Sequence, residues 1–297
     1  MRTEGDSWDI NTSVGSTALF VAAARAIAAR RPDALAVDPY AEVFLRAAGA
    51  EWAALIDGDT EQVREHPLYS ADFGRTFVEF QAARTRYFDD YFEAVTAAGI
   101  RQIVMLAAGL DARAYRLPWP DGTVIYELDQ PRVLEFKRDA LAANGDKARA
   151  DRRAVAVDLH EDWPTALRDN GFDPAERSAW LLEGLLIYLP AATQDELFAT
   201  IDALAAPGSR ISIEQVSPSD QADTPLARQS DAAKDDWMNL IYDEPRSEVA
   251  QWFSERGWDA ERTELTDYLR AAGRDVAVLD VGFPLSSVSL VTAVRRG

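Results

Sequence analysis

The chain has 297 residues and is 47% hydrophobic, which is enough to bury one large α/β core or two smaller ones. Asp and Glu number 50 against 31 Lys and Arg, so the formal net charge is −19. This acidity disfavours nucleic acid and anionic membrane surfaces as partners, because both are bound through clustered basic side chains.

The chain has no cysteine and only two histidines, so we expect no disulfide, no thiolate nucleophile and no metal site. Its first residues lack the apolar core of a signal peptide, and no run of eighteen apolar residues occurs. The sequence therefore predicts a cytoplasmic protein that is not embedded in a membrane.

The N-terminal third is predicted to be helical. The spacing of apolar and small residues indicates helices over 14–31, 39–49 and 75–98. The third helix carries an aromatic stripe, which is more typical of a buried core than of a binding surface. We expect Arg84 and Arg86 near the polar edge of this helix.

From residue 102 onwards, short apolar runs alternate with helical segments. Strands are predicted near 102–107, 123–128, 153–157, 179–183 and 210–216, and helices near 131–143, 161–170 and 191–205. Such alternation predicts right-handed crossovers and a parallel sheet. Two later runs, 258–262 and 287–294, are predicted as the last pair of strands. The fold class is therefore α/β, a doubly wound, Rossmann-like, seven-stranded and mostly parallel sheet.

The segment between the fifth and sixth strands has a different pattern. A polar loop at 217–225 is followed by helical patterns over 226–241 and 246–256. This segment is either a lid over the functional site or an ordinary helical insertion. We expect one domain, consisting of a helical cap (1–98), a core (99–216), a helical lid insertion (217–256) and C-terminal strands (257–297).

A glycine turn and an acidic strand end point to a cofactor site in the core. The apolar run 103–108 stops at Gly109, and the next run ends at Asp129, twenty residues later. In parallel sheets this order lets a backbone approach a nucleotide-type ligand at the glycine while the carboxylate binds ribose hydroxyls. Each feature alone is also typical of a strand-ending turn or a helix cap, but their order and spacing favour the cofactor.

The absence of phosphate-binding motifs disfavours cofactors that contain a pyrophosphate or a triphosphate. Neither G-x-G-x-x-G nor G-x-x-x-x-G-K-[ST] occurs, although a pyrophosphate needs several glycines and a helix N-terminus. A cofactor with a ribose and no phosphates fits better, and S-adenosylmethionine is the common one. Asp129, Asp158 and Glu183 follow three predicted strands, and three acidic groups at one sheet edge suit a cationic, amine-bearing cofactor.

The same region carries a family likeness. The block LAAGLDARAYRLPWP (106–120), followed by YELDQP (126–131), closely resembles the leucine carboxyl methyltransferase superfamily. More narrowly, it is similar to an actinobacterial branch of S-adenosylmethionine-dependent methyltransferases. GDSWDI (5–10), ARTRYFD (83–89) and EGLLIYL (183–189) match that branch too, so the likeness covers nearly the whole chain. It implies the class I methyltransferase fold and S-adenosyl-L-methionine as cofactor.

The resemblance also implies roles for three charged residues. Arg84 corresponds to the arginine that faces the methionine carboxylate of the cofactor. Glu183 corresponds to a glutamate near the methionine amino group. Asp129 corresponds to the acidic residue on the ribose.

Three further residues complete the cofactor site that the resemblance implies. Gly109 corresponds to the motif glycine beneath the cofactor, while Asp158 and Leu159 correspond to the pair that frames the adenine. The chain departs from the carboxyl methyltransferases at Ala107, where they have glycine. The actinobacterial branch tolerates alanine there.

Methyl transfer from a sulfonium needs alignment and, for some acceptors, a base. A carboxylate acceptor is already ionised at neutral pH, whereas a hydroxyl acceptor would need a base. Tyr188 is the candidate for a catalytic residue that orients the acceptor, and packing below the lid is the alternative. Arg113 and Arg116 would either hold a carboxylate substrate or form structural ion pairs.

Two functions from different classes remain open. The first is a methyltransferase that O-methylates a small-molecule carboxylate or hydroxyl. The second is an S-adenosylmethionine-binding protein without catalysis, in a regulatory or scaffolding role. A nicotinamide dehydrogenase is disfavoured by the missing glycines. We expect the acceptor pocket in the least matched part, 217–286, and these motifs specify neither the acceptor nor an oligomeric state.

Overall fold

The computed structural model describes residues 13–58, 60–217, 241–242, 244–279 and 283–297. In these ranges seven strands form one sheet in the order β3-β2-β1-β4-β5-β7-β6. The strands are β1 (Gln102–Leu106), β2 (Val124–Asp129), β3 (Asp151–Ala156), β4 (Ser178–Leu182), β5 (Arg210–Val216), β6 (Trp258–Glu264) and β7 (Val288–Arg295). β1 to β5 are parallel, and β7 is antiparallel to both of its neighbours.

The order of the strands determines where a ligand would bind. The chain adds β2 and β3 on one side of β1 and then returns to add β4 and β5 on the other. In open α/β sheets a ligand binds at the carboxyl ends of the strands beside such a reversal. The register aligns these ends, because Leu106 of β1 pairs with Leu128 of β2 and Leu182 of β4. Asp129 and Glu183 are each one residue beyond that aligned row.

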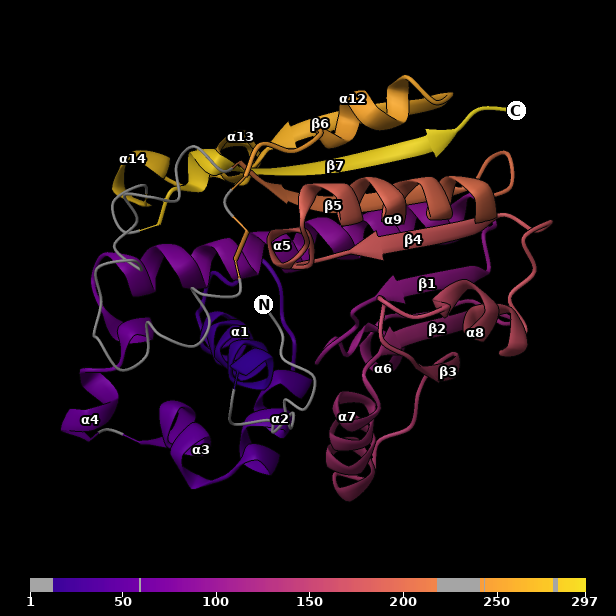
Figure 1. Cartoon of the computed structure of the whole chain (residues 1–297). Helices are drawn as coiled ribbons and strands as arrows, with labels where there is room; N and C mark the ends of the chain where they lie inside the picture. The colour runs from indigo at the N-terminus through magenta and orange to yellow at the C-terminus, as the bar shows by residue number, and fades with distance from the viewer. Residues whose placement is uncertain (1–12, 59, 218–240, 243, 280–282) are drawn as a thin grey trace.

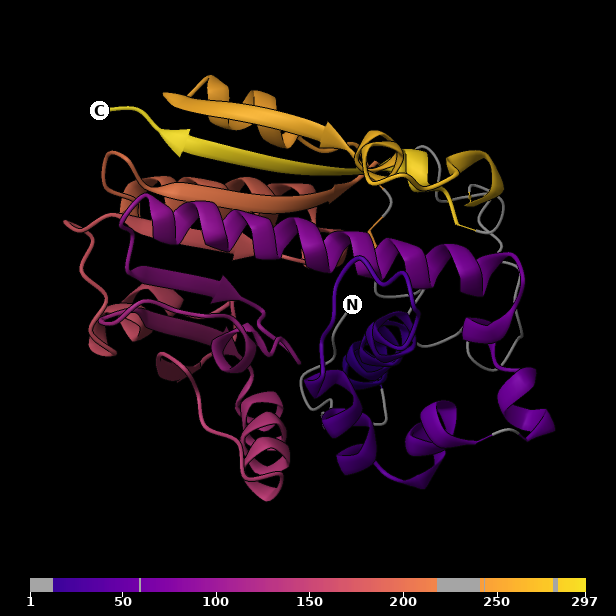
Figure 2. The same cartoon turned by 180° about the vertical axis from the view of Figure 1, so that it is seen from behind.

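Helices cover both faces of the sheet, because each buried strand is apolar on both sides. Along β1, Ile103 and Met105 belong to one core cluster, and Val104 and Leu106 belong to the other. On the first face lie α5 (Phe73–Ala97), α6 (Arg113–Arg116) and α7 (Pro131–Ala143). On the second lie α8 (Trp163–Asp169), α9 (Ala191–Leu204) and α12 (Val249–Ser254). Figures 1 and 2 show the resulting three layers from opposite sides.

The helix α5 is the longest element of the described structure and runs along one face of the sheet (Figure 2). Asp72 caps its start by accepting a hydrogen bond from the backbone N–H of Phe73. Its aromatic stripe is buried, as the sequence predicted, at Phe77, Phe80, Phe88, Tyr91 and Phe92, whereas Tyr87 is only partly buried. The prediction for Arg84 needs correction, because this side chain is only 5% exposed and lies inside the protein. Arg86 is exposed.

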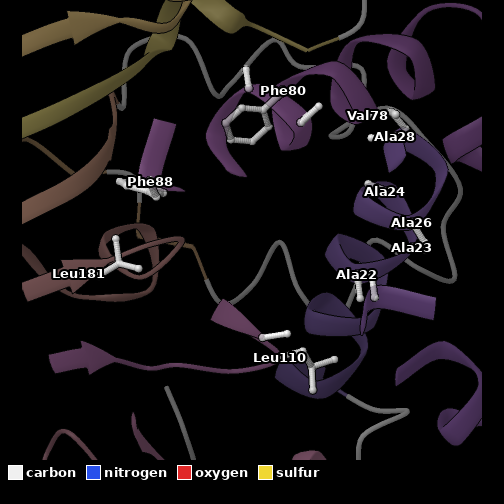
Figure 3. Packing of buried hydrophobic residues seen from close by; sticks show 14 of the residues in the cluster. Ala22, Ala23, Ala24, Ala26, Ala28, Val78, Phe80, Phe88, Leu110 and Leu181 are labelled. Atoms are coloured by element: carbon white, nitrogen blue, oxygen red, sulfur yellow. The ribbon is translucent and has the colours of Figure 1, made fainter. Parts of the chain in front are cut away.

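The N-terminal helices lie on the side to which the arrowheads of the parallel strands point (Figure 1). They are α1 (Ser13–Ala29), α2 (Tyr40–Ala48), α3 (Ala50–Asp57) and α4 (Glu61–Arg64). Alanines predominate on the buried face of α1, which lets it pack closely on α5, and Figure 3 shows them in one cluster with Val78 and Phe80. Arg25 of α1 donates a hydrogen bond to the carbonyl of Leu110, so this helix is tied to the turn after β1.

The short remaining elements are η1 (Pro67–Tyr69), η2 (Leu186–Tyr188), α13 (Leu265–Ala271), α14 (Val276–Leu279) and η5 (Leu285–Ser287). All seven predicted strands are present within one or two residues of their expected ends. Within the predicted helix 246–256 the structure has the shorter α12, whereas nearly all of 226–241 lies outside the described residues. The division into cap, core, lid and C-terminal strands stays a prediction. None of the helices in the described ranges is both long and apolar enough to cross a membrane.

Candidate functional site

The turn after β1 has an unusual backbone. Ala107 and Gly109 both have positive φ angles, of 51° and 46°. In the part of the chain that the structure describes, Ala107 is the only non-glycine residue with a positive φ. A left-handed conformation suits glycine better than any other residue, so the glycine that the resemblance implies at this position fits the backbone. A Cβ atom on Gly109 would meet only the carbonyl oxygen of Ala107, at 3.9 Å, so this side of the turn is open.

Asp129 holds this turn against the end of β2. One carboxylate oxygen, Oδ2, accepts a hydrogen bond from the backbone N–H of Gly109 at 2.7 Å. The other, Oδ1, accepts one from Gln130 N–H, also at 2.7 Å. Burial raises the pKa of Asp129 although both hydrogen bonds act in the opposite direction. Each oxygen keeps a lone pair that can accept a ligand hydroxyl.

The next strand brings Asp158 to the same edge. Its Oδ1 accepts a hydrogen bond from the backbone N–H of His160 at 3.0 Å. The side-chain amide of Gln130 donates to its Oδ2 at 3.4 Å, so Gln130 contacts both Asp129 and Asp158. Leu159 is partly buried against the core cluster of the second face. Asp129 and Asp158 therefore lie side by side at this edge of the sheet, as their places at the ends of two neighbouring strands predict.

Arg84 of α5 and Glu183 after β4 form the other half of the site. The Nε atom of Arg84 lies 3.1 Å from Oε1 of Glu183. Nη1 of Arg84 donates to Oε2 of Glu214 on β5 at 2.8 Å, and the same oxygen accepts from Gly184 N–H at 2.7 Å. Burial alone would lower the pKa of Arg84, but the two carboxylates raise it above the ordinary value.

These two residues belong to a continuous chain of ion pairs that runs from β5 to α1. Its members are Glu214, Arg84, Glu183, Arg113, Asp111, Asp89, Arg116, Asp38 and Arg25. Five carboxylates face four guanidinium groups, which leaves a formal excess of one negative charge. A small cavity lies within this chain and is lined in part by Thr85 and Ala112. The excess charge suits a cationic ligand.

The structure decides between the two roles considered for Arg113 and Arg116. Both side chains bind Asp89 of α5, with shortest contacts of 2.8 Å and 2.6 Å. Arg113 also contacts Asp111 and, at 2.7 Å, Glu183. Arg113 is only 3% exposed, so both arginines are ion-pair residues of the protein interior and not a free carboxylate-binding surface.

Tyr188 lies on η2, five residues after Glu183. Its hydroxyl interacts with Thr17 of α1. The charges of Glu214 and Arg84 lie near enough to shift the pKa of this hydroxyl. Burial raises the pKa of Tyr188 to about 12, so its phenol keeps its proton at neutral pH. Tyr188 can therefore donate a hydrogen bond but is a poor general base.

The donor set fits S-adenosylmethionine. Asp129 presents oriented carboxylate oxygens beside an open glycine turn, and Arg84 with Glu183 offers opposite charges for a zwitterionic end. No group of three or more potential metal ligands exists among the described residues. A surface depression lined by 120–124 and 148–151 lies at the amino ends of β2 and β3, away from these residues.

Several residues of the site were not predicted. Asp111 sits inside the GLDARAYR block, two residues after the motif glycine, and that position was a usable signal. Glu214 was signalled only by its place within an apolar strand, RISIEQV (210–216), where a carboxylate needs a buried partner. Asp89 ends the matched block ARTRYFD (83–89), but neither it nor Asp38 could be assigned to an ion pair, because their arginine partners come from other segments of the chain.

Comparison with known proteins identifies the same family as the sequence motifs. A sequence model of the family described as leucine carboxyl methyltransferase matches residues 18–202. A protein of Mycobacterium sp. (strain KMS), named "Putative S-adenosyl-L-methionine-dependent methyltransferase", is 57% identical over 300 residues, which cover 99% of this chain and 100% of that protein. A protein of the same name from Mycobacterium tuberculosis (strain ATCC 25177 / H37Ra) is 56% identical over 304 residues, with the same coverage.

Two crystal structures have a related fold. One is of a "putative methyltransferase" from Thermobifida fusca YX, with a TM-score of 0.54, 17% identity, and coverage of 86% of this chain and 93% of that one. The other is of a DUF574 family protein from Streptomyces avermitilis, with a TM-score of 0.54, 16% identity, and coverage of 86% and 96%. At this identity the likeness concerns the fold alone. The sequence relatives and the family match confirm the predicted membership: the chain belongs to the leucine carboxyl methyltransferase family, among the S-adenosylmethionine-dependent methyltransferases.

Proposed function

We propose that the protein transfers the methyl group of S-adenosylmethionine to an oxygen atom of a small molecule, and that this oxygen belongs to a carboxylate. The observation that supports this acceptor is the place of Tyr188, whose hydroxyl interacts with Thr17 beside the Glu214–Arg84 ion pair. Burial raises the pKa of Tyr188 to about 12, so the phenol stays protonated at neutral pH and is suited to donate a hydrogen bond to an acceptor oxygen more than to take a proton from a hydroxyl. A carboxylate needs no such step, because it is already ionised.

The cofactor residues follow from the family resemblance and the arrangement of the carboxyl edge. Asp129 accepts hydrogen bonds from the ribose hydroxyls, and Gly109 keeps the turn beneath the cofactor open. Asp158 and Leu159 frame the adenine, with the aspartate beside its amino group. Arg84 binds the methionine carboxylate and Glu183 the amino group. When bound, the cofactor supplies a methyl group on a positively charged sulfur.

The chain itself contributes binding and alignment more than acid–base chemistry. The leaving group of the reaction is a neutral thioether, so no proton needs to be delivered to it. The excess negative charge of the ion-pair chain favours the sulfonium over the neutral thioether product. Tyr188 can donate a hydrogen bond to one oxygen of the acceptor carboxylate while the other oxygen reacts.

The test is a transfer assay with S-adenosylmethionine labelled in its methyl group. Panels of small carboxylic acids and of phenols and alcohols are incubated with the protein, and extracted products are then treated with base. A methyl ester releases volatile labelled methanol under these conditions, whereas a methyl ether does not. Base-volatile label from the acid panel supports the proposal.

Two other outcomes would contradict it in different ways. Base-stable label from the hydroxyl panel would show that the protein transfers methyl groups, but that its acceptor is a hydroxyl and not a carboxylate. Tight binding of S-adenosylmethionine in calorimetry, without transfer to either panel, would favour the alternative, a cofactor-binding protein with a regulatory or scaffolding role.

A further inference from the structure

Four buried or nearly buried charges form a row at the inner end of the site. Glu214 contacts Arg84 at 2.8 Å, Arg84 contacts Glu183 at 3.1 Å, and Glu183 contacts Arg113 at 2.7 Å. Positive and negative charges alternate along the row, and the four charges cancel. The side chains come from β5, α5, the end of β4 and α6, so the row joins four separate elements.

The two inner members of the row, Arg84 and Glu183, each bind an outer member as well as each other. Glu183 uses Oε1 for Arg84 and its other oxygen, Oε2, for Arg113. Arg84 uses Nε for Glu183, while Nη1 binds Glu214 and Nη2 binds Gln81. The central contact can therefore open without releasing either side chain from its outer partner.

The outer members are themselves firmly anchored. Arg113 binds Asp89 and Asp111 in addition to Glu183, and it lies over the rings of Phe88 and Phe92. Glu214, only 5% exposed, accepts a second hydrogen bond from Gly184 N–H. A buried charge keeps its place when several such contacts share the cost of its desolvation.

This arrangement is matched to a ligand with adjoining opposite charges. A zwitterionic amino acid can enter the Arg84–Glu183 contact with its carboxylate on the guanidinium and its ammonium on the glutamate. One ion pair is then replaced by two, and the net charge of the row does not change. Only the outer contacts would keep the inner side chains in position while the central contact is open.

We propose that Arg113 and Glu214 are positioning residues for the amino-acid end of the cofactor, Arg113 by holding Glu183 and Glu214 by holding Arg84. The inference rests on the proposed function, because it needs Arg84 and Glu183 to bind that end. Neither outer residue needs to touch the cofactor. The competing explanation is purely structural: the two residues would only connect α5 and α6 to the sheet.

The two explanations differ in which part of the cofactor is affected. S-adenosylhomocysteine carries the amino-acid end, whereas 5′-methylthioadenosine has the same adenosine and sulfur without it. Calorimetric dissociation constants for both ligands give a discrimination ratio, Kd for methylthioadenosine divided by Kd for adenosylhomocysteine. A positioning role changes this ratio, but a general loosening of the site weakens both ligands and leaves the ratio unchanged.

The variants are Arg113→Lys and Glu214→Gln, each conservative in size, with Arg116→Lys as matched control. Arg116 lies on the same short helix and shares Asp89 with Arg113, but it does not contact Glu183. We expect Arg113→Lys and Glu214→Gln to lower the ratio about tenfold, the effect of one charge-assisted hydrogen bond. Arg116→Lys should leave the ratio within about twofold of the wild-type value, below the effect of one such bond.

Circular dichroism establishes that each variant is folded, and if Arg113→Lys does not fold, Glu214→Gln decides. An unchanged ratio in the folded variants, with discrimination by the wild type, would overturn this inference and leave the proposed function intact. A wild-type protein that binds adenosylhomocysteine no better than methylthioadenosine would instead overturn the roles of Arg84 and Glu183, and this inference with them.

Discussion

Asp129 is the side chain through which the proposed cofactor site can be tested most directly, because its carboxylate oxygens keep lone pairs beyond the hydrogen bonds that they accept in the turn. It accepts two backbone hydrogen bonds in the turn, from Gly109 and Gln130. We expect Asp129→Ala to raise the Kd for S-adenosylhomocysteine at least about 100-fold, since hydrogen bonds to a charged group contribute about 1.5–3 kcal/mol each. Isothermal titration calorimetry measures the change.

The same substitution should leave the fold intact, because the two released N–H groups lie at the sheet edge, where water can replace the carboxylate. The free energy of unfolding is expected to fall by about 1 kcal/mol. Asp121→Ala, at the exposed turn before β2, is the matched control and should change neither quantity. Retained affinity in Asp129→Ala would mean that this carboxylate does not bind the ribose.

The raised pKa of Asp129 predicts a pH dependence of cofactor binding. Protonation removes the charge that strengthens its hydrogen bonds, so affinity for adenosylhomocysteine should decline on acidification while the pH is still above about 4, the ordinary range of an aspartic acid. Calorimetry from about pH 7 down to about pH 4 covers this interval. An affinity that stays constant throughout it would contradict the prediction.

Loss of the fold cannot imitate this effect through Asp129 itself. A carboxyl whose pKa is higher in the folded than in the unfolded state binds its proton more tightly when folded. Its contribution to the free energy of unfolding therefore increases as the pH falls through the raised pKa. The contribution of Asp129 to binding and its contribution to stability consequently change in opposite directions, and circular dichroism at each pH shows whether the protein stays folded.

At the scale of elements, the turn between β1 and α6 contains two residues in the left-handed conformation, Ala107 and Gly109. Gly109→Ala introduces a Cβ that meets no protein atom closer than 3.9 Å, so we expect a loss of only about 1–2 kcal/mol of stability, the usual cost of a left-handed alanine. Cofactor binding should nevertheless be lost, because the methyl group occupies the open side of the turn. Thermal denaturation and calorimetry measure the two effects.

Ala107→Gly is the control for that experiment, since Ala107 already tolerates a φ of 51° with a Cβ atom. It should retain cofactor binding and change the free energy of unfolding by less than about 1 kcal/mol, because relief of backbone strain and the added flexibility of the unfolded chain nearly cancel. If Gly109→Ala bound the cofactor normally, the turn would not approach the ligand and the motif glycine would have only a backbone role.

The elements that could be predicted from the sequence are those whose own residues determine them. β1 and β4 are continuous apolar runs, and α5 has helical spacing over its whole length, so their positions are encoded locally. The short helices α3 and α6 were missed, because helices of one or two turns depend on packing more than on propensity.

The same distinction holds for the site. Asp129 could be identified from its spacing to Gly109, since the strand order converts that spacing into proximity. The burial of Arg84 could not, because its partners Glu183 and Glu214 are about a hundred residues or more away in the chain. Whether a long charged side chain is buried is decided by the partners it meets, and its own helix reveals only that it is polar.

At the scale of the whole molecule, the formal net charge of −19 acts against the folded state, which brings these charges closer together. Added salt screens such repulsion, because the Debye length falls from about 30 Å at 0.01 M to about 8 Å at 0.15 M. Salt also weakens exposed ion pairs such as Arg138–Asp139, but these contribute only about 0–1 kcal/mol each. The buried row around Arg84 and Arg113 is screened little.

Repulsion should therefore dominate, and we expect the midpoint of thermal unfolding to rise by a few degrees between about 20 mM and 500 mM NaCl, since about 1 kcal/mol shifts the Tm of a domain of 150–250 residues by about 2–4 °C. Sodium chloride is preferable to sulfate, which stabilises proteins by exclusion from their surface. Calorimetry in the absence of cofactor measures the change. A midpoint that falls with salt would mean that the exposed ion pairs stabilise the protein more than the repulsion of its net charge destabilises it. The buried row could not account for such a fall, because salt screens it little.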